Sequence, residues 1–253
     1  MQLPADDATT LALLYHLNSG VWSNTEAYAD AYELQHKAIP DPQAIPLEAP
    51  GDPSDLAKLI AGRTSCRKFA ARAMPFEKLA RILHFSYGTT GLRHDTGLPW
   101  PILGRAVPSA GALYPLEIYA GVRNVEGVAD GVYHYNAVEQ RLERLERCGA
   151  TDLWRCLYYP EFVENANLLF MIAAVFKRTM KKYGPRGYRY ILLEAGHCAQ
   201  NMCLLAAEGG LATLCMGGFH DDLSMYTLGF NGQDEAVVYG IGAGFPAGQV
   251  PGK

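Results

Sequence analysis

A long apolar segment around residue 200 constrains the fold more than any other part of the chain. Within residues 190–206, apolar side chains recur at intervals of three and four, and the intervening positions are mostly small or apolar too. That pattern predicts a helix buried in the middle of a domain. Glu194 and His197 interrupt it too closely for a bilayer span, so we expect His197 to be a hydrogen-bonded core histidine. Gly209-Gly210 should end the helix, and residues 211–216 should form a strand.

The remaining patterns predict a mixed α+β fold. Helices are predicted over residues 10–16, 55–61, 76–87 and 151–158, and strands over 116–122, 131–136, 140–145, 168–176 and 236–241. The unbroken apolar run at 168–176 is typical of a central strand buried on both faces. Residues 88–106 contain Gly, Pro, His and Arg and predict a long loop that could act as a lid.

The N-terminal region differs from the rest of the chain. Prolines at positions 40, 42, 46, 50 and 53 predict an extended connector. We therefore expect an N-terminal arm over residues 1–52, which either wraps a neighbour or is a disordered lead-in. Residues 53–253 are predicted to form one domain.

Composition excludes several classes of function. A net charge of −4 argues against a nucleic-acid partner. The six cysteines contain no Cys-x-x-Cys pair, which favours free thiols in a reducing cytoplasm. No basic start followed by an apolar run indicates a signal peptide, so we expect a cytoplasmic protein without a membrane partner. His220-Asp221-Asp222 lacks further ligands at suitable spacing, so no metal site is predicted.

Four short segments carry residues suited to chemistry. Residues 63–69 place three cations and two hydroxyls before a phenylalanine, which could grip a phosphate or form a solvated basic loop. Residues 107–115 are small, with Gly and two prolines, and allow a close backbone approach. Lys182-Tyr183 is either a catalytic pair or a solvated lysine beside a packed ring. Gly217-Gly218 is either an ordinary turn or a second site of close approach.

Together these segments resemble the SagB-type dehydrogenases, the azoline-oxidase branch of the nitroreductase-like flavoenzymes. The resemblance covers about residues 55–245 and depends on the order of the motifs. These are Arg63-x-Ser65-x-Arg67-x-Phe69, Pro108-Ser-Ala-Gly-Ala-Leu-Tyr-Pro115, Gly131-Val-Tyr-His-Tyr, Lys182-Tyr-Gly, Arg189-Tyr190, Glu194-Ala-Gly-His197, Gln200-Asn201 and Gly217-Gly-Phe219.

The resemblance implies a nitroreductase-like three-layer fold with a central mixed or antiparallel sheet, and a domain-swapped homodimer with two FMN sites at the subunit interface. The implied FMN-binding residues are Arg63, Ser65 and Arg67 for the phosphate and ribityl chain, Pro108, Ser109, Ala110 and Gly111 for a loop along the flavin from the other subunit, and Gly217 and Gly218 facing flavin N5 and O4. A backbone N–H near N5 would stabilise negative charge on the reduced ring. Many superfamily members complete the phosphate site with a C-terminal cation, and here only Lys253 could serve.

The resemblance also implies a reaction: a peptide thiazoline or oxazoline is oxidised to the azole. A base removes a proton from the former Cα carbon, and a hydride moves from the neighbouring carbon to flavin N5. Lys182 and Tyr183 match the family's catalytic pair, with either residue as the base. The azoline could belong to a peptide or to a chain on a carrier protein, and a cyclodehydratase or synthetase complex is an expected partner. The rival hypotheses are an NAD(P)H-dependent nitroreductase or other flavin oxidoreductase, and a flavin-free scaffold.

Overall fold

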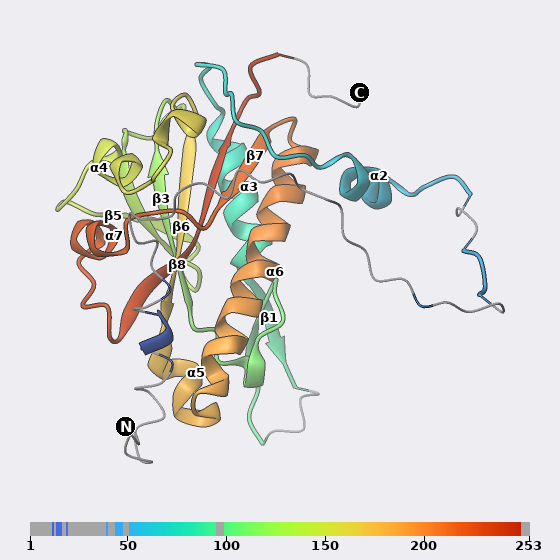
Figure 1. Cartoon of the computed structure of the whole chain (residues 1–253), viewed down its shortest axis with the longest axis vertical. Helices are drawn as coiled ribbons and strands as arrows, with labels where there is room; N and C mark the ends of the chain where they lie inside the picture. Colours follow the sequence, from blue (N-terminus) through green and yellow to red (C-terminus); the bar gives the residue numbers. More distant parts are fainter. Residues whose placement is uncertain are drawn as a thin grey trace.

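The computed structural model describes residues 12, 14–16, 19, 39, 44–47, 51–94 and 99–248 of the chain. Its centre is a six-stranded antiparallel sheet in the order β5-β4-β3-β6-β8-β7 (Figure 1). The strands are β3 (Leu116–Val122), β4 (Gly131–Asn136), β5 (Arg141–Arg144), β6 (Leu168–Val175), β7 (Ala212–Met216) and β8 (Glu235–Gly244). The strands predicted from the sequence are therefore confirmed, with bounds shifted by a few residues.

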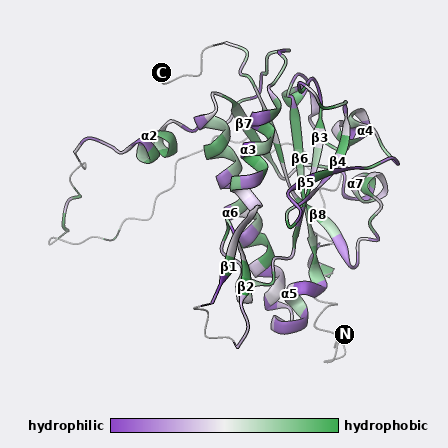
Figure 2. Ribbon diagram, turned by 180° about the vertical axis from the view of Figure 1, so that it is seen from behind, coloured by the Kyte–Doolittle hydropathy of each residue, from purple (hydrophilic) through white to green (hydrophobic). Residues whose placement is uncertain are grey.

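Strand β6 lies inside the sheet between β3 and β8, and all its residues except Val175 are buried. Alternate side chains point to opposite faces of a strand. Phe170 and Ile172 pack on one face with the helices of residues 76–87 and 186–208, while Leu169 and Met171 pack on the other with the helix of residues 150–155. Both faces are apolar because both are covered, as the unbroken apolar run predicted. Figure 2 shows the central strands in hydrophobic colours.

Helices cover both faces of the sheet and make a three-layer α+β fold, which confirms the predicted fold class. On one side lie α3 (Phe76–Tyr87) and α6 (Arg186–Glu208). On the other side lie α4 (Ala150–Arg155) and α7 (Asp221–Leu228). Short 3-10 turns occur at Ala110–Ala112 (η1) and Pro160–Val163 (η2).

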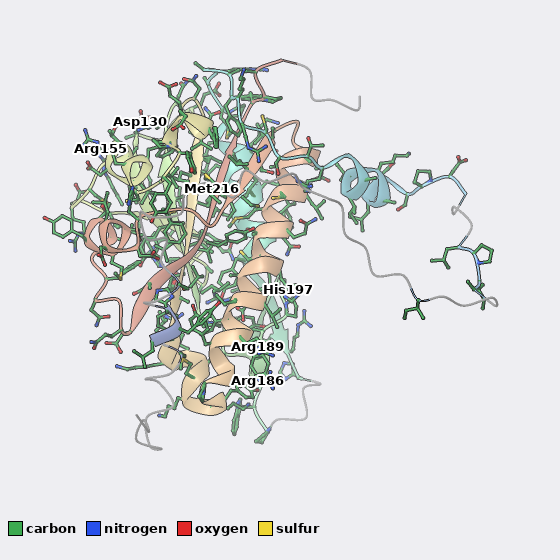
Figure 3. All side chains as sticks on the ribbon, viewed as in Figure 1. Asp130, Arg155, Arg186, Arg189, His197 and Met216 are labelled. Carbon is green, nitrogen blue, oxygen red and sulfur yellow. The ribbon has the colours of Figure 1, made fainter. Side chains whose placement is uncertain are left out.

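Helix α6 is the long helix predicted near residue 200, but the expectation that it is buried all round is wrong for a single chain. Ile191, Ala195 and Met202 are buried toward the sheet. Leu193 on the outer side is 56% exposed, and His197, predicted as a core histidine, is exposed as well. Figure 3 shows His197 on the side of α6 that faces away from the sheet. The sheet covers one face of α6, whereas Leu192, Leu193, Gly196 and His197 on the outer side are exposed.

Residues 88–106 are not simply a loop, which corrects the prediction made from the sequence. They contain an antiparallel hairpin of β1 (Thr89–Arg93) and β2 (Ile102–Arg105), with a bulge between Thr89 and Gly91. Four of the five β1 residues are exposed. Neither face of the hairpin is buried, so its sequence does not alternate between apolar and polar residues. This pattern therefore could not predict the two strands.

Helix α2 (Asp55–Gly62) is N-capped by Ser54, whose hydroxyl accepts a hydrogen bond from the Ala57 N–H at 3.2 Å. It has no buried residue and extends away from the sheet and its helices (Figure 1). Ala12 and Leu14–His16 are helical, as predicted for residues 10–16. Most of the predicted connector and Lys253 lie outside the described residues. Within the described ranges, no helix combines the length and apolar character needed to cross a membrane.

Candidate active site

The predicted phosphate-binding segment lies beside strand β7. The Cys66 N–H donates to the Thr213 carbonyl at 2.8 Å, and Ser65 forms a parallel bridge with Thr213. Further along, Phe69 is buried and forms a bridge with Pro246, which fixes the end of the segment. Because Gly217-Gly218 directly follows β7, the structure brings the predicted phosphate residues and the glycine turn to the same edge of the sheet.

The cations of this segment suit an anionic ligand. Among the described residues, neither Arg63 nor Arg67 forms an ion pair with a carboxylate. The Arg67 guanidinium lies 5.8 Å from the centre of the Phe162 ring. A Cβ built on Gly217 would meet no atom within 4 Å, so the turn opens onto free space. Unpaired guanidinium groups beside an exposed glycine backbone fit the phosphate and ring edge of FMN.

Two cysteines lie next to this segment and locate it along α6. The Sγ atoms of Cys203 on α6 and Cys215 on β7 are 3.5 Å apart. The hydrogen bond between the two thiols lowers the pKa of Cys215, and the positive charge of Arg63 acts in the same direction. Arg63 is therefore close to the last third of α6.

The predicted catalytic pair and the small-residue loop form a second cluster. In the loop, Gly111 has a φ of 62°. A Cβ built on it would lie 2.7 Å from the Tyr183 hydroxyl and 2.8 Å from the Lys182 ammonium. The Lys182 Nζ atom is 5.3 Å from the centre of the Tyr183 ring. Only a glycine fits here without displacing the pair, so the structure brings Lys182, Tyr183 and Gly111 together.

The position of the pair follows from how the chain leaves the central strand. β6 runs directly into helix α5 (Phe176–Tyr183), whose Phe176, Thr179 and Met180 are buried. Gly184 then turns the chain at a φ of 57°. A Cβ built on Gly187, in the first turn of α6, would lie 2.9 Å from the Met180 Cα, so the two helices meet closely. Lys182 and Tyr183 thus occupy the end of a helix held between β6 and α6.

A buried hydrogen-bond network holds the loop of residues 107–115 on its inner side, and sequence reasoning missed this network. The Ser109 hydroxyl accepts the Tyr114 N–H at 2.9 Å and interacts with the Glu194 carboxyl group. The Tyr87 hydroxyl donates to Glu194 at 3.1 Å and accepts the Leu116 N–H at 3.1 Å. Glu194 is only 2% exposed, and burial raises its pKa despite these hydrogen bonds. A carboxyl group on an otherwise apolar helix face was the available signal for such a network.

The two clusters lie at different levels of α6 within one chain. Tyr183 packs edge to face on Tyr190 near the start of the helix, with ring centres 5.2 Å apart, whereas Arg63 acts on Cys203. Tyr190 and Cys203 are separated by about 20 Å along the helix axis, at roughly 1.5 Å per residue. In Figure 3, Arg186 is labelled at the start of α6, and Met216, which precedes the glycine turn, is labelled toward the other end of the helix. The structure therefore holds two half-sites and does not bring all the predicted residues together in a single chain.

The cysteines and the possible metal ligands are the remaining chemically reactive side chains. All six cysteines are free thiols. No three His, Cys, Asp or Glu side chains in the part of the chain that the structure describes are arranged to hold a metal ion.

The fold is a three-layer α+β fold of the nitroreductase-like class, with Arg63, Arg67 and the Gly217-Gly218 turn at one edge of its sheet. The sequence model of the Nitroreductase family matches residues 60–245, so the chain belongs to the nitroreductase family. A nitroreductase-type protein of Methanocaldococcus jannaschii is 36% identical over 195 residues, which cover 76% of this chain and 87% of that protein.

Two relatives are named for the processing of peptides. The microcin B17-processing protein McbC of Escherichia coli is 33% identical over 130 residues, which cover 49% of this chain and 48% of McbC. The trifolitoxin-processing protein TfxB of Rhizobium leguminosarum bv. trifolii is 34% identical over 116 residues, which cover 43% of this chain and 31% of TfxB. The matched segments thus span about half of McbC and about a third of TfxB.

Solved structures agree on the fold. A chain of the E. coli microcin synthetase McbBCD complex with truncated pro-MccB17 bound superposes with a TM-score of 0.69, over 94% of this chain and 92% of that chain, at 21% identity. A nitroreductase-type protein from Anabaena variabilis gives a TM-score of 0.63 at 26% identity, over 76% of this chain and 38% of that one. At 21% identity the likeness to the synthetase chain shows the fold alone.

Proposed function

We propose that this protein is an FMN-dependent dehydrogenase that oxidises a thiazoline or oxazoline in a peptide, or in a chain on a carrier protein, to the aromatic azole. One observation carries the proposal: the Lys182 ammonium and the Tyr183 hydroxyl converge on Gly111, in the loop expected to lie along the flavin. Removal of the proton from the former Cα carbon requires a base at this point, and the pair could supply it. The peptide-processing relatives support the same function.

The residues of the chain divide into those that bind and those that transfer a proton. Arg63, Ser65 and Arg67 would hold the FMN phosphate, and the Gly217-Gly218 turn would face the ring edge. When bound, FMN would supply the acceptor for a hydride, which carries both electrons of the oxidation. Aromatisation removes two hydrogens from the azoline ring, one as a hydride and one as a proton. Tyr183 Oη as a phenolate, or Lys182 Nζ as a free amine, would take the proton from the carbon that was the amino acid's Cα, and the other group would stabilise the charge that develops.

Two chains are needed to complete the site in this proposal. Because the half-sites lie about 20 Å apart along α6, the loop of residues 108–111 would serve the flavin held by the partner. The uncovered outer face of α6, with Leu192 and Leu193 exposed, supports a homodimer. Leu56 and Ile60 on α2 are exposed as well, and this helix stands away from its own sheet, which supports an exchanged arm.

The likeness to a chain of the McbBCD complex supports a peptide substrate and a synthetase or cyclodehydratase complex as partner. The free state of all six thiols supports the expected location in the cytoplasm.

The direct test is to replace Lys182 with Ala and Tyr183 with Phe, and to measure oxidation of a thiazoline peptide by the appearance of the thiazole absorbance. We expect each variant to bind FMN as the wild type does and to lose turnover by roughly 100-fold or more, the usual contribution of a positioned acid or base. Lys181→Ala is the matched control, because this neighbouring lysine is exposed. Full turnover by both variants with flavin bound would remove the pair from the mechanism.

The second candidate function is an NAD(P)H-dependent nitroreductase, which the M. jannaschii relative favours. Anaerobic addition of NADPH separates the two functions. Rapid bleaching of the flavin by NADPH alone favours the nitroreductase, whereas bleaching by the azoline peptide alone favours the dehydrogenase. A colourless protein that takes up no added FMN would instead indicate the flavin-free scaffold.

A further inference from the structure

A cavity lined by both charged and apolar side chains lies next to the proposed catalytic pair and is not used by the proposed function. Its volume is about 530 Å³, and it lies between β2, η1, β4 and α5. Ala112, which lines it, follows Gly111 of the loop that touches Lys182 and Tyr183. Arg178, which also lines it, precedes Lys182 by one turn of α5. A group bound in the cavity would therefore sit about one helical turn from the proposed site of proton transfer.

Arg105 is the unusual side chain in this cavity. It is half-buried, and its guanidinium carbon lies 4.5 Å from the centre of the Tyr87 ring and 5.2 Å from that of Tyr114. Stacking on aromatic faces fixes the guanidinium plane and leaves its N–H edge available. Within the described ranges, that guanidinium has neither an ion-pair partner nor a hydrogen-bond acceptor. The Glu194 carboxyl group lies near enough for the charge of Arg105 to lower its pKa, against the raising effect of burial, but the two groups form no ion pair.

The other charges around the cavity are compensated by one another. Arg178 pairs with Glu117 at 2.6 Å, and His134 contacts the same carboxylate at 2.8 Å. The other nitrogen of His134 lies 3.2 Å from Glu143, which also pairs with Arg141 at 2.8 Å. Each carboxylate therefore has two basic partners, whereas the Arg105 guanidinium forms no ion pair with any described residue. The cavity is electrostatically suited to an anion.

We propose that this cavity is a specificity subsite in which Arg105 binds a carboxylate of the substrate. The identity of the substrate as an azoline peptide rests on the proposed function, whereas the carboxylate site rests on the cavity itself. A planar guanidinium with a free edge matches a carboxylate through two parallel hydrogen bonds. Leu103 and Leu113 line the cavity and would contact the aliphatic part of the bound residue. The carboxylate is either an acidic side chain near the azoline or the C-terminus of the peptide.

The test measures binding rather than turnover. The probes are fluorescein-labelled hexapeptides with one thiazole, carrying Glu or Gln at each flanking position and a free acid or an amide at the C-terminus. We expect one carboxylate peptide to bind FMN-loaded wild type about 10-fold or more tighter than its neutral partner, the range for a charged hydrogen bond. The Glu/Gln comparison and the acid/amide comparison distinguish the two sources of the carboxylate.

Three variants then assign the preference to a residue. Arg105→Gln should abolish the preference, and Arg105→Lys should keep part of it, since the ammonium retains the charge but not the planar fork. Arg155→Gln is the control, because Arg155 is an exposed arginine on α4, on the opposite side of the sheet from α6 (Figure 3). Thermal unfolding and FMN content would show that each variant is folded.

Equal binding of acidic and neutral peptides by the wild type overturns the inference, and this comparison needs no variant. Retention of the full preference by Arg105→Gln overturns it as well. The proposed function is tested separately by azoline oxidation. Turnover of charged and neutral peptides at equal KM would leave the dehydrogenase standing without the subsite. A carboxylate preference in a protein that oxidises no azoline would leave the subsite standing without the dehydrogenase.

Discussion

Replacement of Gly111 with alanine tests the contact on which the proposed site depends. Its backbone has a φ of 62°, where an L-residue is strained by about 1–2 kcal/mol. The new methyl group would lie 2.7 Å from the Tyr183 hydroxyl and 2.8 Å from the Lys182 ammonium. Both contacts are too short, so the ends of the two side chains must move. Because these ends are flexible, we expect the movement to cost little stability but to displace the proposed base.

We therefore expect Gly111→Ala to reduce turnover much more than it reduces thermal stability. Strain of about 1–2 kcal/mol in a chain of this length lowers Tm by about 2–8 °C. Displacement of a proton-transferring group by about 1 Å lowers turnover by a factor on the order of 100. Thermal unfolding of the FMN-loaded protein gives the first quantity, and the rate of thiazole formation gives the second. FMN content must be equal in both proteins for the comparison to hold.

Gly127→Ala provides a matched control. Gly127 has a φ of 74°, and a Cβ built on it meets no atom within 4 Å. The same substitution there adds backbone strain without a side-chain collision. We expect Gly127→Ala to lower Tm by a similar amount and to retain turnover. If Gly111→Ala also retained turnover, Lys182 and Tyr183 would not act at the position where the structure places them.

Three further predictions test other parts of the site. Arg63→Gln and Arg67→Gln should each weaken FMN binding by about 10- to 100-fold, the range for a charge-assisted hydrogen bond. Binding of FMN and of riboflavin is measured by fluorescence titration of the flavin with the protein. Riboflavin binding should change little because riboflavin has no phosphate. The hydrogen bond with Glu117 raises the pKa of His134 above its ordinary value of 6.5, so its contribution to stability is present at acid pH and is lost as the pH rises through the folded pKa. The difference in unfolding free energy between wild type and His134→Gln should therefore be larger at about pH 5.5 than at about pH 9, and no change with pH would contradict the raised pKa. Leu193→Glu should weaken the proposed dimer by about 30-fold or more, because a hot spot at an interface carries about 2 kcal/mol; sedimentation of the variant as a stable dimer would place the interface elsewhere.

The sequence predicted the elements whose surroundings leave a regular pattern. Residues 168–176 have apolar side chains on both faces, and β6 is covered on both faces. The spacing within residues 190–206 marked α6, and the helix predicted over residues 55–61 is α2. In each case the signal is local, because it depends on the residues of the segment itself.

The sequence could not predict features that depend on distant partners. The hairpin at 89–105 has little buried surface, so its side chains carry no alternation. The environment of α6 was predicted wrongly because an apolar helix looks the same whether its second face meets its own domain or another chain. The Tyr87 and Glu194 contact joins residues 107 positions apart, and no spacing rule reaches that far.

The arrangement of the half-sites gives a physical reason for a two-chain enzyme. Lys182 and Tyr183 stand at the end of α5, which β6 and α6 hold on either side, and the loop they touch is tied to Glu194 inside the same chain. The residues proposed to hold the FMN phosphate, in contrast, lie on segment 63–69 at the β7 edge of the sheet. The two groups of residues are separated by about 20 Å along the axis of α6. No side-chain rotation within one chain can bring them together. A second copy packed on the outer face of α6 can, since a twofold axis across that helix sets the start of one α6 against the later turns of the other. Loss of the dimer should therefore abolish oxidation even where every catalytic and phosphate-binding residue is intact.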